Sequence, residues 1–109
     1  MKNKNKNNLE VPEEFLRFLV LGVLNEVYPE PLEFKEIDSL FKDIDYPQKR
    51  CIRIIEYFNE KKYIHIKSLT SLRITAEGID YFEILKKKMT QEISENLREL
   101  FREKIGFQV

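Results

Sequence analysis

Apolar residues recur at helical spacing over the first quarter of the chain. From Pro12 the apolar positions fall at steps of three and four, which predicts a helix with a broad apolar face. The members of this face are Leu16, Leu19, Val20, Val23, Leu24 and Val27. Phe15, Phe18 and Leu21 extend the apolar surface nearly all round the helix. Such a helix needs more than one packing partner. The domain core is one, and either the C-terminal helix or a second subunit is the other.

A second, shorter helix follows after a proline-containing break. The segment from Tyr28 to Leu32 reads YPEPL, and its two prolines end the first helix. The next apolar positions share one side of a short helix. They are Phe34, Ile37, Leu40 and Phe41. Asp43 to Tyr46 is a polar turn, in which Asp45 or Tyr46 is expected to cap a third helix.

The third helix runs directly into a hairpin. Pro47 suits the first helical position, and a helix is expected from there to about Lys62. One face is apolar and the opposite face is charged. The apolar members are Cys51, Ile54, Ile55 and Phe58, and the charged ones are Lys49, Arg53, Glu56 and Glu60. The period then becomes two, so that Ile64 and Ile66 point one way and Tyr63, His65 and Lys67 the other. After the polar turn Ser68 to Ser71, Leu72 and Ile74 alternate with Arg73 and Thr75.

A long C-terminal helix is predicted after Thr75, which is suited to cap it. Its apolar stripe meets neither Pro nor Gly before Gly106, so a single helix of roughly 29 residues would be about 43 Å long. The stripe comprises Ile79, Phe82, Leu85, Met89, Ile93, Leu97, Leu100 and Phe101. A small domain does not cover such a rod. Homodimerisation through this helix and the aromatic side of the first would bury it. The alternative is a helix that breaks near Thr90 and folds back on its own domain.

The order of these elements resembles that of a winged helix-turn-helix domain over residues 12–85. The most specific segment is LRITAEGIDYFE, Leu72 to Glu83, which is similar to the strand, Thr, polar, Gly and hydrophobic-helix segment of prokaryotic winged-helix regulators. The resemblance implies a mainly α fold with a small β-hairpin (α+β), in which the third helix is the recognition helix and the hairpin is the wing. It also implies a short strand at Leu32 to Phe34 that pairs with the wing. It assigns no subfamily.

Length and composition set the limits of these expectations. A chain of 109 residues with 42% apolar residues supports one domain with one modest core. No apolar run reaches the roughly 20 residues that a membrane span requires, and the start lacks the apolar region of a signal peptide. With a single cysteine, we expect a cytoplasmic protein. Residues 1–11 are expected to be a disordered basic arm, either simply solvated or reaching a phosphate or a minor groove, and residues 86–109 a C-terminal helix for dimerisation.

Charge is segregated along the chain although the formal net charge is zero. Residues 9–45 carry three basic against ten acidic residues, whereas residues 46–73 carry seven basic against two acidic. Because salt screens charges beyond roughly 8 to 10 Å, a ligand at the third helix and the hairpin would feel mainly the basic segment. The zero total therefore does not argue against nucleic-acid binding.

Side-chain chemistry argues against an enzyme and against a cofactor. The only histidine, His65, lies on a predicted strand, and the only cysteine, Cys51, lies on a predicted buried helix face, where cysteine usually acts as a small hydrophobe. One Cys and one His do not provide the three or four ligands of a zinc site. The three glycines are too far apart for a phosphate-binding loop. We therefore expect no catalysis, no metal and no cofactor.

The resemblance implies double-stranded DNA as the partner. The N-terminal part of a recognition helix enters the major groove, where Arg53 is suited to a guanine, Gln48 to an adenine and Ile52 to a thymine methyl group. The remaining candidates would bind the phosphate backbone and position the protein without reading sequence. They are Lys49, Arg50, Lys61, Lys62, His65, Lys67 and Arg73. For Arg50 and Arg53, pairing with Glu56 or a neighbouring acidic residue is the alternative.

Two roles follow for such a module. One is sequence-preferring DNA binding by a homodimer, as a transcriptional regulator or as an accessory factor in plasmid replication or conjugative transfer. The other is a winged-helix module that contacts proteins and does not bind DNA, to which the acidic first half and Glu56 and Glu60 are suited. The salt dependence of duplex binding separates the two.

Overall fold

The fold is mainly helical, with one small antiparallel sheet. The computed structural model describes residues 12–43, 48–92, 95, 98–99 and 102–103. In chain order the elements are α1 (Glu13–Val27), β1 (Leu32–Glu33), α2 (Phe34–Asp43), α3 (Gln48–Glu60), β2 (Ile64–Ile66), β3 (Ser71–Ile74) and α4 (Ala76–Glu92). The predicted α+β class, the first three predicted helices and the strands of the predicted hairpin are confirmed in this part of the chain. The predicted basic arm and the predicted cap at Asp45 or Tyr46 lie outside the described residues.

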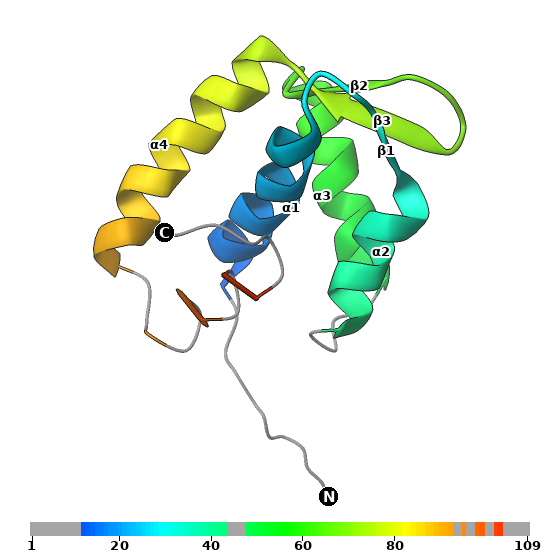
Figure 1. Cartoon of the computed structure of the whole chain (residues 1–109). Helices are drawn as coiled ribbons and strands as arrows, with labels where there is room; N and C mark the ends of the chain where they lie inside the picture. The colour runs from blue at the N-terminus through cyan, green and yellow to red at the C-terminus, as the bar shows by residue number, and fades with distance from the viewer. Residues whose placement is uncertain (1–11, 44–47, 93–94, 96–97, 100–101, 104–109) are drawn as a thin grey trace, which may run out of the picture.

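Helix α1 forms the centre of the molecule. Figure 1 shows it between α4 on one side and the pair α2 and α3 on the other, with the sheet at one end of the helices. Phe15, Phe18 and Leu21 have no exposed surface, and the Phe18 ring stacks on Phe82 of α4 with 5.2 Å between centroids. The second partner of α1 is thus α4 of the same chain. The predicted dimer contact through the aromatic side of α1 is wrong, because those side chains are already buried.

The sheet joins the start of α2 to the hairpin that follows α3. Its strand order is β1-β3-β2, with Leu32 opposite Leu72 and Ile64 opposite Ile74. The predicted short strand at Leu32 is confirmed, although Phe34 already belongs to α2. Ile64 is buried, but Ile66, which was expected on the same face, is 47% exposed. The difference arises because β2 is an edge strand, so a residue near the outer end of the hairpin has few neighbours to cover it.

The end of α3 turns the chain into β2 through a residue with a left-handed backbone. Lys62 has a φ of 65°. Its amide donates to Asn59 O, and the Tyr63 amide donates to Phe58 O at 2.9 Å. These two hydrogen bonds form a Schellman motif, and the Phe58 and Tyr63 rings, 6.1 Å apart, supply its usual apolar contact. The hairpin therefore leaves α3 in a defined direction.

The junction of β3 and α4 explains the Thr-x-x-Gly segment. Thr75 Oγ1 accepts a hydrogen bond from the Gly78 amide at 3.1 Å, which caps α4 as predicted. The same hydroxyl donates to Lys62 O at 2.6 Å. A Cβ atom on Gly78 would lie 2.1 Å from Tyr63 O, so the first turn of α4 packs directly on the backbone at the start of the hairpin.

Helix α4 is shorter than predicted. Its described span is Ala76–Glu92. Arg98 Nη2 donates to Thr90 O at 3.2 Å, a contact that a straight helix does not allow, and in Figure 1 the described pieces at 98–99 and 102–103 do not continue the axis of α4. The single helix reaching Gly106 is therefore wrong, and a break near Thr90, the alternative, agrees with the structure. Lys88 Nζ lies 2.9 Å from Glu14 Oε2 in the first turn of α1. Beyond this point a straight α4 would pass the end of α1 and leave its apolar stripe uncovered. Residues 85 and 86, between which a boundary is expected, both belong to α4, and Leu85 and Met89 are buried; the division into domains stays a prediction.

Candidate nucleic-acid interface

The outer face of α3 exposes the predicted groove-reading residues. Cys51, Ile54, Ile55 and Phe58 are buried against the core, which leaves Lys49, Ile52 and Arg53 on the solvent side. Ile52 is 41% exposed. Neither Lys49 nor Arg53 forms an ion pair with a residue that the structure describes. The N-terminal half of α3 therefore offers two available cations with an apolar residue between them.

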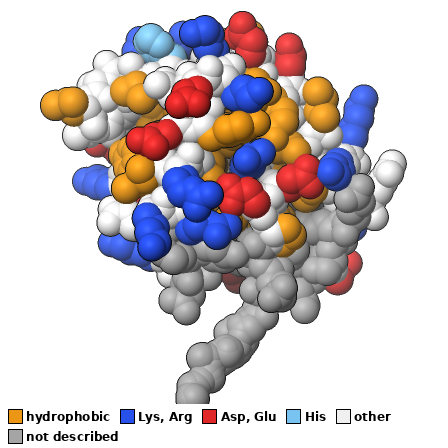
Figure 2. Space-filling view, turned by 180° about the vertical axis from the view of Figure 1, so that it is seen from behind, with side chains coloured by type: hydrophobic (Ala, Val, Ile, Leu, Met, Phe, Trp, Pro, Cys, Tyr) orange, Lys and Arg blue, Asp and Glu red, His pale blue; other side chains and the backbone are white. Residues whose placement is uncertain are grey.

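The C-terminal half of the same face carries the opposite charge. Glu56 and Glu60 are exposed one and two turns after Arg53. Figure 2 shows Lys and Arg side chains gathered toward the lower left of the side that it presents, with Asp and Glu side chains next to them. The cationic surface of α3 is therefore restricted to its first two turns.

Arg50 is placed differently from the prediction. Its Nη2 lies 2.7 Å from Glu13 Oε1 in the first turn of α1, and its side chain is 34% exposed. The acidic partner is 37 residues away in the chain, so the local pattern around Arg50 did not indicate it. The Arg50 side chain thus forms an ion pair that connects α3 with α1. It does not point outward as a phosphate contact would require.

The hairpin contributes a second group of cations. His65 and Arg73 lie opposite each other on β2 and β3, and His65 and Lys67 are exposed. Arg73 is half-buried and its Nη1 donates to Ile74 O at 3.3 Å, so it is less available than Lys67. Lys61 and Lys62 are exposed at the end of α3, with Lys61 Nζ 5.8 Å from the centre of the Tyr57 ring. These two lysines lie at the opposite end of α3 from Lys49.

A hollow of about 340 Å³ connects the start of α3 with the tip of the wing. Its lining combines residues from β1, α2, α3 and the turn between β2 and β3. They are Glu33, Phe34, Lys35, Asp38, Gln48, Leu69 and Thr70. Gln48 and the wing tip therefore share one surface. The fold brings Gln48 and Leu69, which are 21 positions apart in the chain, to one surface.

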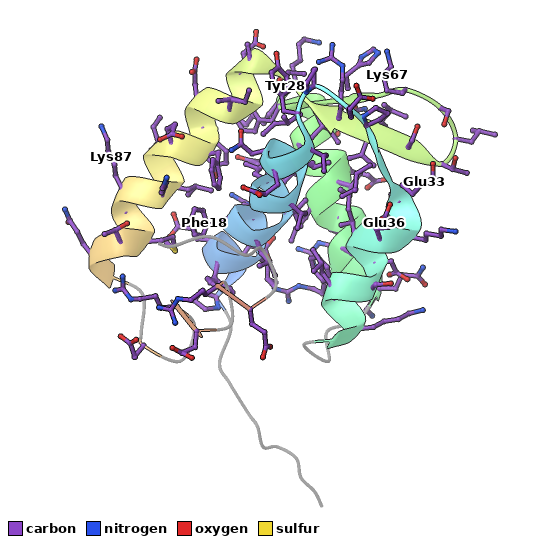
Figure 3. All side chains as sticks on the ribbon, viewed as in Figure 1. Phe18, Tyr28, Glu33, Glu36, Lys67 and Lys87 are labelled. Carbon is purple, nitrogen blue, oxygen red and sulfur yellow. The ribbon has the colours of Figure 1, made fainter. Side chains whose placement is uncertain are left out.

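The same hollow brings acidic residues close to the wing. Glu33 lies opposite Ser71 of β3, and Figure 3 shows Glu33 and Glu36 on the α2 side below the wing, while Lys67 projects near the top of the sheet. Asp38 is 8% exposed, with Oδ2 3.5 Å from Lys42 Nζ and a buried Oδ1 that has no hydrogen-bond partner among the described residues. Acidic and basic residues are therefore less separated in space than along the sequence, because β1 places Glu33 next to the basic hairpin.

The chemistry of the remaining candidates is that of a packed interior. Cys51 is fully buried, and burial, with the nearby Asp38 carboxylate, raises the pKa of its thiol to about 12. Such a thiol is a poor nucleophile at neutral pH. Within the described ranges, no group of His, Cys, Asp and Glu side chains is arranged to hold a metal ion. No helix in that part of the chain has the length and apolar character needed to cross a membrane.

Two residues that shape this surface are not among the predicted site residues. Leu69 falls within the predicted polar turn, where a leucine among serine and threonine residues is the one signal of an unusual tip. Glu13, the partner of Arg50, is indicated by no local pattern.

Comparisons of the chain with models of protein families, with curated proteins and with solved structures found no match.

Proposed function

We propose that this protein binds double-stranded DNA in a sequence-preferring manner through the N-terminal half of α3 and the wing. The observation that carries the proposal is the hollow shared by Gln48 and the wing tip. A rod-shaped ligand that contacts the start of α3 would meet the wing as well. Winged helix-turn-helix proteins bind the major groove with this part of the recognition helix.

Each exposed side chain has a role that suits its chemistry. Arg53 is exposed and forms no ion pair with a described residue, so its guanidinium can donate two hydrogen bonds to guanine O6 and N7. Ile52 offers an apolar contact for a thymine methyl group. Gln48 is suited to adenine. Lys49 and Lys67 would neutralise phosphates on either side, and such contacts add affinity without reading sequence. Arg50 has no base-reading role in this proposal because it is held by Glu13.

The experiment begins with selection of bound duplexes from a random pool, followed by affinity measurements on the selected site. Arg53→Ala is expected to reduce discrimination between the selected site and a scrambled site by roughly 5- to 100-fold, since a bidentate contact contributes about 1 to 3 kcal/mol of discrimination. Lys67→Ala is expected to weaken both duplexes alike and to lower the salt slope by about one.

Lys87→Ala is the matched control. Lys87 is an exposed lysine on α4, on the opposite side of the molecule from the wing (Figure 3). Its replacement removes the same charge and is expected to leave specific binding unchanged. Equal behaviour of Arg53→Ala, Lys67→Ala and the wild-type protein would reject the proposal.

A protein-binding role is the second candidate, and one observation favours it. Ile52 and Ile66 are exposed apolar residues close to the cationic surface, and Glu56 and Glu60 follow on α3. Such a mixture suits a polypeptide partner as well as a duplex. A protein module would show no duplex affinity that falls steeply with salt, whereas DNA binding predicts a log–log slope of about −0.9 for each phosphate contacted.

The proposal includes a homodimer acting in the cytoplasm, as a regulator of transcription or an accessory factor of plasmid replication or transfer. Ile84 on the outer side of α4 is 64% exposed, which supports α4 as the contact now that the aromatic side of α1 is excluded. Two recognition helices of a dimer would read half-sites about 34 Å apart. Mass measurement in solution, and two-fold symmetry of the selected sites, test the dimer.

A further inference from the structure

The tip of the wing presents a leucine whose side chain is fully exposed in the part of the chain that the structure describes. Leu69 is 102% exposed, more than any other large apolar residue in the described ranges. Its neighbours Ser68, Thr70 and Ser71 have short polar side chains. A single exposed leucine is ordinary on a protein surface. Leu69 differs from an ordinary exposed leucine because hydrogen bonds hold the backbone of its turn in place.

The turn that carries Leu69 is braced from inside. The amides of Lys67 and Ser68 both donate to Ser71 O, at 2.9 and 3.2 Å. Ser68 Oγ accepts from the Thr70 amide at 3.2 Å and lies 3.0 Å from Ser71 Oγ. The Phe34 amide donates to Thr70 O at 2.7 Å, which fixes the turn to the start of α2. The backbone therefore holds Leu69 outward without using its side chain.

The hairpin itself is basic, which favours a polyanion as the partner of this tip, although Glu33 and Asp38 line the hollow beside Leu69. From Lys61 to Thr75 the chain has four lysine and arginine residues and no acidic residue. Lys67 is exposed two positions before Leu69. A tip whose other side chains are short is compatible with a minor groove about 6 Å wide. Leucine is among the apolar side chains that proteins insert between base pairs from that groove.

We propose that Leu69 enters the minor groove of the bound duplex as an apolar wedge and partly unstacks one base step, which kinks the DNA. This inference rests on the proposed DNA-binding function and deepens it, since it assigns indirect readout to the wing. The preferred step is a pyrimidine–purine step such as TA, because such steps unstack most easily. The site would thus be specified by the major-groove contacts of α3 and by deformability beneath the wing.

The test uses the selected duplex with the adenine analogue 2-aminopurine placed singly at each flanking step. Its fluorescence rises when the base is unstacked. Wild-type protein is expected to raise the signal at one step and to bend an end-labelled duplex in an energy-transfer measurement. Leu69→Ala is expected to abolish both signals and to lower affinity on the order of tenfold. Leu69→Met, which remains apolar and similar in volume, is expected to keep them.

Two controls separate the wedge from other effects. Because the Leu69 side chain is fully exposed, Leu69→Ala should unfold at the wild-type temperature. Lys67→Ala is expected to weaken binding while retaining the unstacking signal at saturating protein. Lys67 is assigned a phosphate contact that adds affinity, whereas the kink is assigned to Leu69.

The outcomes distinguish the wedge from the proposed function. If the wild-type protein binds the selected duplex with no unstacked step, or Leu69→Ala unstacks and bends it as wild type does, the wedge is overturned and DNA binding stands. The tip would then be free to contact a polypeptide. If the wild-type protein selects no duplex, the proposed function and the wedge both fail.

Discussion

At the residue scale, Gly78 and Lys62 determine how the hairpin is attached to the helices. Gly78 allows the first turn of α4 to lie on the carbonyl of Tyr63. Lys62 adopts the left-handed conformation that ends α3, at a position where glycine is the more usual residue. The conformations of two backbone positions thus place the start of the wing relative to α3.

Gly78→Ala is expected to destabilise the protein by about 1 to 3 kcal/mol, because the added Cβ would collide with backbone rather than with a flexible side chain. The free energy of unfolding from urea titration measures the effect. Glu83→Ala, at an exposed position of the same helix, is the control. A Gly78→Ala variant more stable than wild type by about 1 kcal/mol, as helix propensity alone predicts, would contradict the packing argument.

At the scale of elements, the fold depends on the pairing of α1 with α4. The first helix is apolar nearly all round, and α4 covers the side that the core of α2, α3 and the sheet leaves open. The Phe18 and Phe82 rings stack across this contact. Burial of α1 is therefore completed within one chain.

Phe18→Ala is expected to cost about 3 to 5 kcal/mol of stability, as for other buried aromatic residues. Because the contact is intramolecular, the loss should not depend on protein concentration. Ile84→Ala, on the exposed side of α4, should change the monomer's stability by no more than about 0.5 kcal/mol. A destabilisation by Phe18→Ala that disappears at high protein concentration would show that this face is shared between subunits.

The same scale shows how far the sequence alone could lead. The third helix and its buried face were predictable because four apolar residues at steps of three and four leave one orientation for the helix. The wing strands followed from the change to alternation. The length of α4 was not predictable, because its apolar stripe continues past Met89. Only the position of the first turn of α1, marked by the pair of Glu14 and Lys88, shows where the partner surface ends.

At the scale of the whole molecule, tertiary structure determines which charges surround the wing and the third helix. The sequence separates acidic residues from the basic segment. Strand β1 then carries Glu33 back to β3, and Glu13 pairs with Arg50 of the basic helix. The surface offered to a polyanion is therefore smaller than the charge count of residues 46–73 implies.

Glu33→Gln is expected to raise duplex affinity about two- to fivefold at low salt, because it removes a negative charge beside the wing, and the gain should shrink as salt increases. Fluorescence anisotropy at several salt concentrations measures it. Glu83→Gln on α4 removes the same charge on the opposite side and should have no comparable effect. Weaker binding of the ligand by Glu33→Gln would instead indicate a partner that uses this carboxylate, as a basic polypeptide would.

The sequence by itself determined the order of helices and strands, the buried face of α3, the cap at Thr75 and the candidate groove-reading residues, because each depends on periodicity or on contacts between near neighbours in the chain. Tertiary structure alone decided the partner of Arg50, the acidic residues beside the wing, the end of α4 and the shared surface of Gln48 and Leu69. These depend on which distant segments meet. Local pattern carries no information about such contacts, since any exposed charge or apolar stripe is compatible with several partners.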